Sequence, residues 1–301
     1  MKDQDTFSGL HPVINFLFFG LVLAITMCIQ HPVERIVSLA AAVSYDIYLN
    51  GRRAVRFSLL FMLPMMVLAA AVNPAFSHEG VTVLTYLPSG NPLTLESVLY
   101  GVSSAVMLAA VVLWFACYST VMTSDKFVYL FGRVIPALSL VLSMTLRFVP
   151  KFRDQIRVVG EAQRCVGRDP STGGVFQRAK KGVTILSIMV TWALENAIET
   201  ADSMKGRGYG LPGRSAFSIY RFDPRDKETL TWVCLSGFTV LCAWAAGGYY
   251  WRYYPSLKGV IFGRPGLMFH LMFMALCFTP LAMDIYSDIN WKRLYARAAS
   301  R

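Results

Sequence analysis

The chain has 301 residues, of which 55% are hydrophobic and only 16% are charged, with a formal net charge of +11. This balance excludes an ordinary soluble domain, because the chain is too small to bury so many nearly uncharged stretches of about 17 residues or more. The six cysteines form no CxxC pair, so the sequence indicates neither a disulfide framework nor a zinc motif. The composition therefore predicts an all-α, polytopic membrane protein.

Six membrane spans are predicted in chain order, at residues 13–30, 33–49, 57–73, 95–122, 228–251 and 266–286. The first is interpreted as a retained span rather than a signal peptide, because it lacks a small-residue cleavage site. Lys and Arg are enriched in cytoplasmic loops, so the basic loop 51–56 and the basic tail after Tyr286 are expected inside. The loop 73–94 has no Lys or Arg and is expected outside. Both termini are then cytoplasmic, although the basic loop 252–265 fits this orientation poorly.

The segment 124–227 has a different character, because it contains more than half of the 29 Lys and Arg residues. It is predicted to be a cytoplasmic domain between an N-terminal transmembrane bundle (1–123) and C-terminal spans with a basic tail (228–301). Apolar residues recur at intervals of three or four, which predicts two long amphipathic helices, the first from about Pro136 to Gly167. The stripes are Val149, Phe152, Ile156, Val159 and Val166, and then Leu186, Met189, Ala193, Leu194, Ala197, Ala201 and Met204. The alternative that 137–149 and 183–194 are short spans stays open.

The two amphipathic helices end in similar sequences, EAQRCVGRD at 161–169 and ADSMKGRGYG at 201–210. Each end alone is compatible with a simple helix cap, since glycine adopts the left-handed conformation there and arginine complements the helix dipole. A glycine on each side of Arg207 would also let a partner's backbone approach closely, while the guanidinium forms a forked pair with a carboxylate. Neither end matches the phosphate-binding GxxxxGK[ST] pattern, so we expect no ATP site in this chain.

With these features the chain resembles the transmembrane T component of energy-coupling factor (ECF) transporters, the EcfT/CbiQ family. The segments LRFVPKF (146–152), EAQR (161–164) and GRGYG (206–210) lie where the family has its landmarks. The resemblance implies an N-terminal bundle of spans, followed by long cytoplasmic coupling helices, each tipped by an Ala-Arg-Gly motif. In that family the tips insert into grooves of two ABC-type ATPase subunits, and the apolar helix faces carry a substrate-binding S component.

The resemblance assigns roles to particular residues of this chain. The implied ATPase-docking residues are Arg164, Cys165, Val166 and Gly167 in the first tip, and Gly206, Arg207 and Gly208 in the second. The implied S-component-facing residues are Phe152, Ile156, Val159, Met189, Leu194 and Met204. Two positions depart from the family, because Gly206 replaces its alanine and Val166 replaces its arginine. The first tip is therefore expected to dock more weakly, or through apolar contacts.

The sequence thus favours a non-catalytic coupling subunit, in a prokaryotic cell membrane, of an ATP-driven importer for a vitamin or a transition-metal ion. ATP and magnesium would bind to the partner ATPases, with no cofactor in this chain; membrane lipid is expected as a partner, and nucleic acid is not. The alternatives are a polytopic membrane enzyme and a stand-alone transporter. An enzyme would show ionisable residues inside the spans or a cluster of histidine and aspartate residues near the membrane. The four histidines, His11, His31, His78 and His270, are interpreted as scattered interfacial or loop residues.

Overall fold

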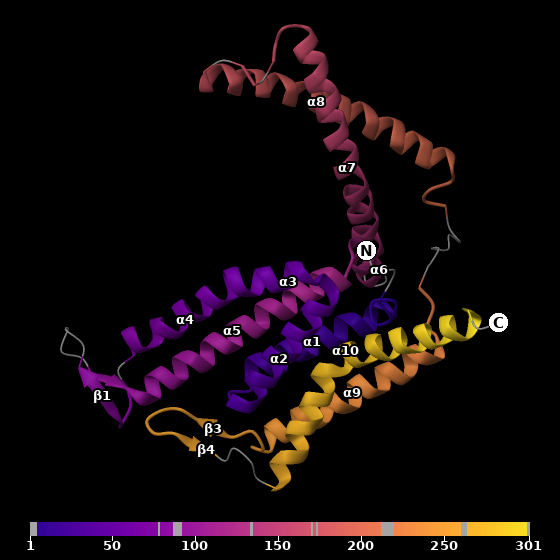
Figure 1. Cartoon of the computed structure of the whole chain (residues 1–301). Helices are drawn as coiled ribbons and strands as arrows, with labels where there is room; N and C mark the ends of the chain where they lie inside the picture. The colour runs from indigo at the N-terminus through magenta and orange to yellow at the C-terminus, as the bar shows by residue number, and fades with distance from the viewer. Residues whose placement is uncertain are drawn as a thin grey trace. The chain divides into compact units, whose positions relative to one another are not determined.

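The computed structural model describes residues 5–77, 79–86, 92–132, 135–169, 171–172, 174–211, 220–259 and 264–299 (Figure 1). The described chain is mostly helical, which confirms the predicted all-α class. It divides into two compact units, Met1–Thr123 together with Tyr220–Arg301, and Ser124–Ile219. We call the first the membrane unit and the second the central unit.

The membrane unit is a bundle of helices with two short antiparallel hairpins. Its helices are α1 (Pro12–Cys28), α2 (Pro32–Asn50), α3 (Arg52–Phe57), the π-helical turn η1 (Ser58–Met62), α4 (Leu63–Phe76), α5 (Leu95–Val121), α9 (Pro224–Ala245) and α10 (Arg264–Ala299). One hairpin, β1 (Val83–Tyr86) with β2 (Pro92–Thr94), joins α4 to α5, and the other, β3 (Trp251–Arg252) with β4 (Lys258–Gly259), joins α9 to α10. Proline occupies the first turn of α1, α2 and α9, where its missing N–H leaves no helical hydrogen bond unmade.

Helices occur at all six predicted span positions, but they differ in apolar character. Among the described residues, four segments are long and apolar enough to cross a membrane: Arg52–Phe76, Leu95–Val121, Pro224–Ala245 and Gly266–Ala298. Helix α1 is apolar but only 17 residues long. Helix α2 does not qualify, because it carries three buried charged residues, Glu34, Arg35 and Asp46. The prediction of six apolar spans therefore holds for four of them on length and composition.

The predicted end of the fifth span was wrong, and the basic C-terminal tail extends the last helix. Helix α9 ends at Ala245 rather than near residue 251, because Gly247 takes a left-handed conformation with φ of +79° and turns the chain into the β3–β4 hairpin. Helix α10 continues without a break to Ala299, so the basic tail after Tyr286 is helical.

The core of the membrane unit is built around α1. Helix α5 packs against both α4 and α2, α2 packs against α10, and α10 packs against α9, while α1 contacts α5 and α9. Buried aromatic rings meet edge-to-face, with centroids 5.2 Å apart for Phe7 and Phe18 and 6.0 Å apart for Phe18 and Trp114. The Trp114 indole donates a 3.0 Å hydrogen bond to the Ser38 hydroxyl, which satisfies its one polar atom.

Helix α5 lies very close to the backbone of α4 at Gly101, where a side chain would not fit. A Cβ atom added there would lie 2.5 Å from the carbonyl oxygen of Ala70. We therefore expect Gly101→Leu to lower the free energy of unfolding of the membrane unit by at least roughly 1–3 kcal/mol, the usual cost of overpacking. Gly20→Leu is the matched control, because nothing lies within 4 Å of an added Cβ in that exposed part of α1. Equal melting temperatures of the two variants in detergent would contradict this packing.

Candidate docking tips of the central unit

The central unit consists of α6 (Ser124–Gly132) and the two long helices α7 (Pro136–Cys165) and α8 (Val175–Gly206). Helix α7 begins at Pro136 and continues through Pro150. Neither α7 nor α8 is among the described helices that are apolar enough to cross a membrane. The alternative of short spans at 137–149 and 183–194 stays a prediction, because each of these segments is shorter than a full membrane span.

Helix α7 ends in a Schellman motif, in which backbone N–H groups just after the helix donate hydrogen bonds to its last carbonyl groups. Gly167 adopts the left-handed conformation with φ of +77°. Its N–H donates to the Arg164 carbonyl at 2.9 Å, and the Arg168 N–H donates to the Gln163 carbonyl at 2.8 Å. Val166 is the C-cap residue directly before the glycine, and 69% of its surface is exposed.

Helix α8 ends in the same motif, position for position. Gly208 also has φ of +77°, and its N–H donates to the Lys205 carbonyl at 2.9 Å. The Tyr209 N–H donates to the Met204 carbonyl at 3.0 Å. The C-cap residue is here Arg207. Val166 and Arg207 therefore occupy the same C-cap position in the two tips, a valine in the first and an arginine in the second.

The first tip already pairs its arginine internally. The Arg164 Nε lies 3.3 Å from Asp169 Oδ1, which also accepts hydrogen bonds from the Ser171 N–H at 2.9 Å and the Ser171 hydroxyl at 2.8 Å. These Ser171 bonds, together with the nearby Arg164 charge, hold the pKa of Asp169 below its ordinary value. The carboxylate is thus ionised at neutral pH and holds the Arg164 guanidinium within the tip.

The second tip presents its arginine differently. Arg207 is exposed, and within the part of the chain that the structure describes its side chain makes no hydrogen bond or ion pair. Nothing lies within 4 Å of a Cβ added to the neighbouring Gly206. The fold of this chain therefore does not require a glycine at that position for space, and the bare backbone beside Arg207 is open to a partner.

Three of the apolar residues assigned to the S component are instead at least partly covered within the structure. Val159 is 9% exposed and Met189 only 6% exposed. The Phe152 ring packs edge-to-face on Trp192 of α8, with centroids 5.5 Å apart. These residues serve the packing of the structure itself, whatever else they contact.

The other three apolar residues have more exposed surface. Ile156 is 50% exposed and Leu194 is 62% exposed, while Met204 is partly exposed near the second tip. The apolar stripes are thus divided between residues that pack inside the structure and residues that leave apolar surface without a described partner.

One cluster of ionisable residues was missed from the sequence. His31 and His270 both lie against Glu34 in the membrane unit, so the interpretation of the histidines as scattered was wrong for these two. His11 lies elsewhere, with its ring 4.4 Å from that of Phe222, and His78 lies outside the described residues. The spacing of His31 and Glu34 at a helix start was visible in the sequence, but their meeting with His270 depends on the tertiary fold.

Comparison with known proteins agrees with these elements. The family model for CbiQ, described as a cobalt transport protein, matches residues 5–219. The energy-coupling factor transporter transmembrane protein EcfT of Lacticaseibacillus paracasei is 37% identical over 108 residues, which cover 36% of this chain and 39% of that protein. The EcfT of Lactobacillus helveticus is 31% identical over 151 residues, covering 45% and 54%. EcfT 1 of Listeria monocytogenes is 27% identical over 192 residues, covering 59% and 67%.

The matched part of this chain spans 39% and 54% of the length of the first two relatives. The family model, in contrast, covers well over half of this chain and includes the membrane helices α1 to α5 as well as both tips. The chain therefore belongs to the EcfT/CbiQ family of transmembrane components of energy-coupling factor transporters.

Proposed function

We propose that this chain is the coupling subunit of an ECF-type ABC importer, which links ATP hydrolysis by two ATPase subunits to uptake of a vitamin or a transition-metal ion. The observation that carries the proposal is the pair of long helices that end in the same Schellman motif, each with an exposed C-cap residue. Two equivalent ends suit two related ATPases, one tip for each. In this proposal the chain itself is non-catalytic, and ATP and magnesium bind to the ATPases.

The packing of α7 against α8 suits the transmission of movement from the tips. The helices have 30 and 32 residues, or roughly 45 Å each at ~1.5 Å per residue. The Phe152 and Trp192 rings join the two helices. Lys151 Nζ also donates a 2.9 Å hydrogen bond to Asn196 Oδ1. The same ammonium group lies 5.4 Å from the centre of the Trp192 ring, a cation–π contact. In this proposal a displacement of one tip reaches the other helix through the contacts at this crossing.

The S component is proposed to bind the apolar residues that α7 and α8 leave exposed, such as Ile156 and Leu194. Exposed apolar surface of this extent on a basic, otherwise polar unit is typical of a protein interaction site. Positive loops and the basic end of α10 favour an orientation with the central unit and both termini in the cytoplasm of a prokaryotic cell. The transported substrate is then selected by the S component and not by this chain.

Purification of the tagged chain from native membranes in mild detergent tests the proposal. We expect a stoichiometric complex with two ATPase subunits, each with a GxxxxGK[ST] motif, and one small membrane protein, and we expect the complex to hydrolyse ATP. A stand-alone transporter or a membrane enzyme would instead purify alone with its activity. Isolation of an active chain without ATPases would therefore overturn the proposed function.

A further inference from the structure

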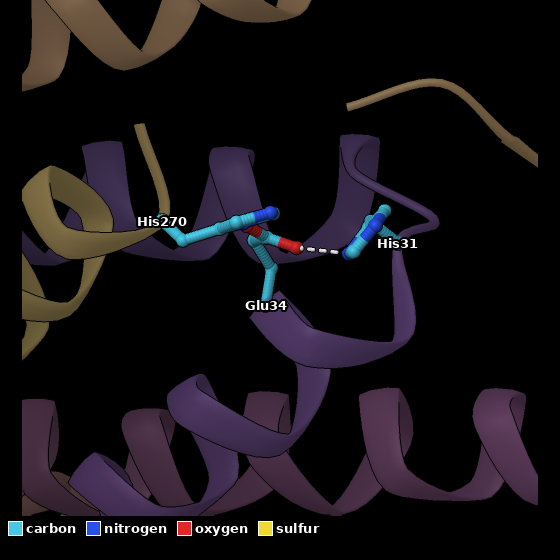
Figure 2. A group of neighbouring side chains, drawn as sticks. All are labelled: His31, Glu34 and His270. Carbon is cyan, nitrogen blue, oxygen red and sulfur yellow. Dashed lines mark hydrogen bonds and ion pairs between the residues drawn. The ribbon is translucent and has the colours of Figure 1, made fainter. Parts of the chain in front are cut away.

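The membrane unit contains a buried group of three side chains that could bind a metal ion. His31 precedes α2 as its N-cap residue, Glu34 lies in the first turn of α2, and His270 lies in the second turn of α10 (Figure 2). The His31 Nδ1 is 2.6 Å from one Glu34 oxygen, and the His270 Nδ1 lies against the other oxygen. The three side chains are only 1%, 2% and 7% exposed, respectively for His31, Glu34 and His270.

The arrangement brings donors together from distant parts of the chain. Glu34 and His270 are 236 residues apart, and one ligand atom from each of the three residues lies within 4.8 Å of the others. His31 and Glu34 are three residues apart at the start of one helix, a spacing that places two side chains on the same face. Each nitrogen faces its own oxygen of the shared carboxylate, so the three side chains converge on one small volume.

We propose that His31, Glu34 and His270 form a binding site for a divalent transition-metal ion of the zinc class. Two imidazoles and one carboxylate are a ligand set found in zinc sites that keep a fourth position open, with bonds of about 2.0–2.2 Å. Imidazole nitrogen favours zinc, nickel and copper, while magnesium and calcium prefer all-oxygen sites. A divalent ion would also compensate the buried Glu34 carboxylate, whose burial without a cation or proton donor is costly.

Aromatic neighbours restrict the orientation of both imidazoles. The His31 ring centre lies 5.5 Å from that of Trp251, and the His270 ring centre lies 5.7 Å from that of Tyr249. The two imidazoles are themselves 4.9 Å apart with an interplanar angle of 35°. A bound ion would join the start of α2 to the start of α10, two helices that pack against each other. The site lies in the membrane unit, so the inference does not depend on the proposed docking of the central unit.

Metal analysis of the full-length chain tests the site. The protein, purified in detergent with its affinity tag removed, is stripped with a chelator, dialysed against buffered Zn²⁺ and analysed by mass spectrometry for bound metal. We expect one Zn²⁺ per chain, with affinity reduced at least about tenfold in Glu34→Gln and in His270→Gln, since even outer-sphere changes have effects of that size. Zn²⁺ should also raise the melting temperature of the wild type but not of the two variants, because a ligand that binds only the folded state stabilises it.

Glu96→Gln is the matched control. Glu96 is a buried carboxylate in the first turn of α5, where it accepts a 3.0 Å hydrogen bond from the Thr82 hydroxyl. This variant removes the same charge from the first turn of another helix and should keep the bound Zn²⁺. If folded wild type and Glu34→Gln bind the same amount of Zn²⁺, the cluster is a hydrogen-bonded group only. If Glu34→Gln does not fold, the measurements on the wild type test the site. Wild-type protein that binds no Zn²⁺, or whose melting temperature Zn²⁺ does not raise, would overturn the proposal.

Discussion

Replacing Arg207 by glutamate should abolish ATP-coupled uptake and release an ATPase subunit from the complex. Arg207 is the exposed C-cap residue of α8 and has no ion-pair partner among the described residues, so its guanidinium is available to a carboxylate of another protein. Loss of one member of a buried charged pair typically costs about 2–5 kcal/mol, partly because the other charge stays unpaired. Glutamate adds repulsion to that loss. Uptake and ATP hydrolysis in proteoliposomes, together with ATPase co-purification, measure the effect.

Three further variants separate docking from capping. Arg207→Lys should restore little, because an ammonium cannot form the forked pair of a guanidinium. Val166→Glu changes the equivalent C-cap position of α7, where no arginine is present, and should have a smaller effect. Arg164→Ala should only weaken coupling, because Arg164 already pairs with Asp169 in its own tip. Full transport by Arg207→Glu with both ATPases bound would show that the glycines and the arginine only terminate the helix.

The sequence predicted those parts of the fold that depend on local chemistry. The spacing of three or four between apolar residues located α7 and α8, and the glycine after each stripe located their ends. Gly167 and Gly208 take the left-handed conformation that the sequence led us to expect at a helix end. The family resemblance had already placed Val166 at the position that Arg207 holds in the second tip. Local sequence could not show that both ends form the same Schellman motif, because that depends on which carbonyl each N–H bonds.

Features that depend on tertiary contacts were not predicted. Hydropathy alone missed the charged residues that α2 buries, and it extended α9 through the turn at Gly247. The cluster of His31, Glu34 and His270 escaped notice because its members meet only when α10 packs against α2. The role of a histidine in an apolar segment cannot be predicted until the side chains that surround it in the folded structure are known.

Sequence periodicity also could not predict which residues of the apolar stripes are buried and which are exposed. Phe152 and Ile156 are one turn apart on the same stripe, yet Phe152 packs on Trp192 while Ile156 is 50% exposed. Helix α8 crosses α7 rather than running along it (Figure 1), so only residues near the crossing pack between the two helices. A 3.6-residue period identifies the apolar face of a helix but not which part of that face another helix covers.

That division gives the second prediction. Leu194→Glu should release the S component while both ATPases stay attached, because Leu194 is 62% exposed on the apolar surface proposed to bind that subunit. A carboxylate placed there must lose its water on binding without a compensating partner, which is costly. The isolated chain should keep its melting temperature, since the glutamate in the unbound protein remains in contact with solvent. Leu194→Met, which preserves apolar volume, should keep the S component bound.

Met189→Glu is the contrasting change on the same helix. Met189 is only 6% exposed, so a carboxylate there would be buried in the free chain and should lower the melting temperature and disturb binding of both kinds of partner. Subunit stoichiometry after affinity purification and thermal unfolding of each variant distinguish the two cases. Retention of the S component by Leu194→Glu, or loss of the ATPases from that variant at an unchanged melting temperature, would show that the exposed stripe is not a separate partner surface.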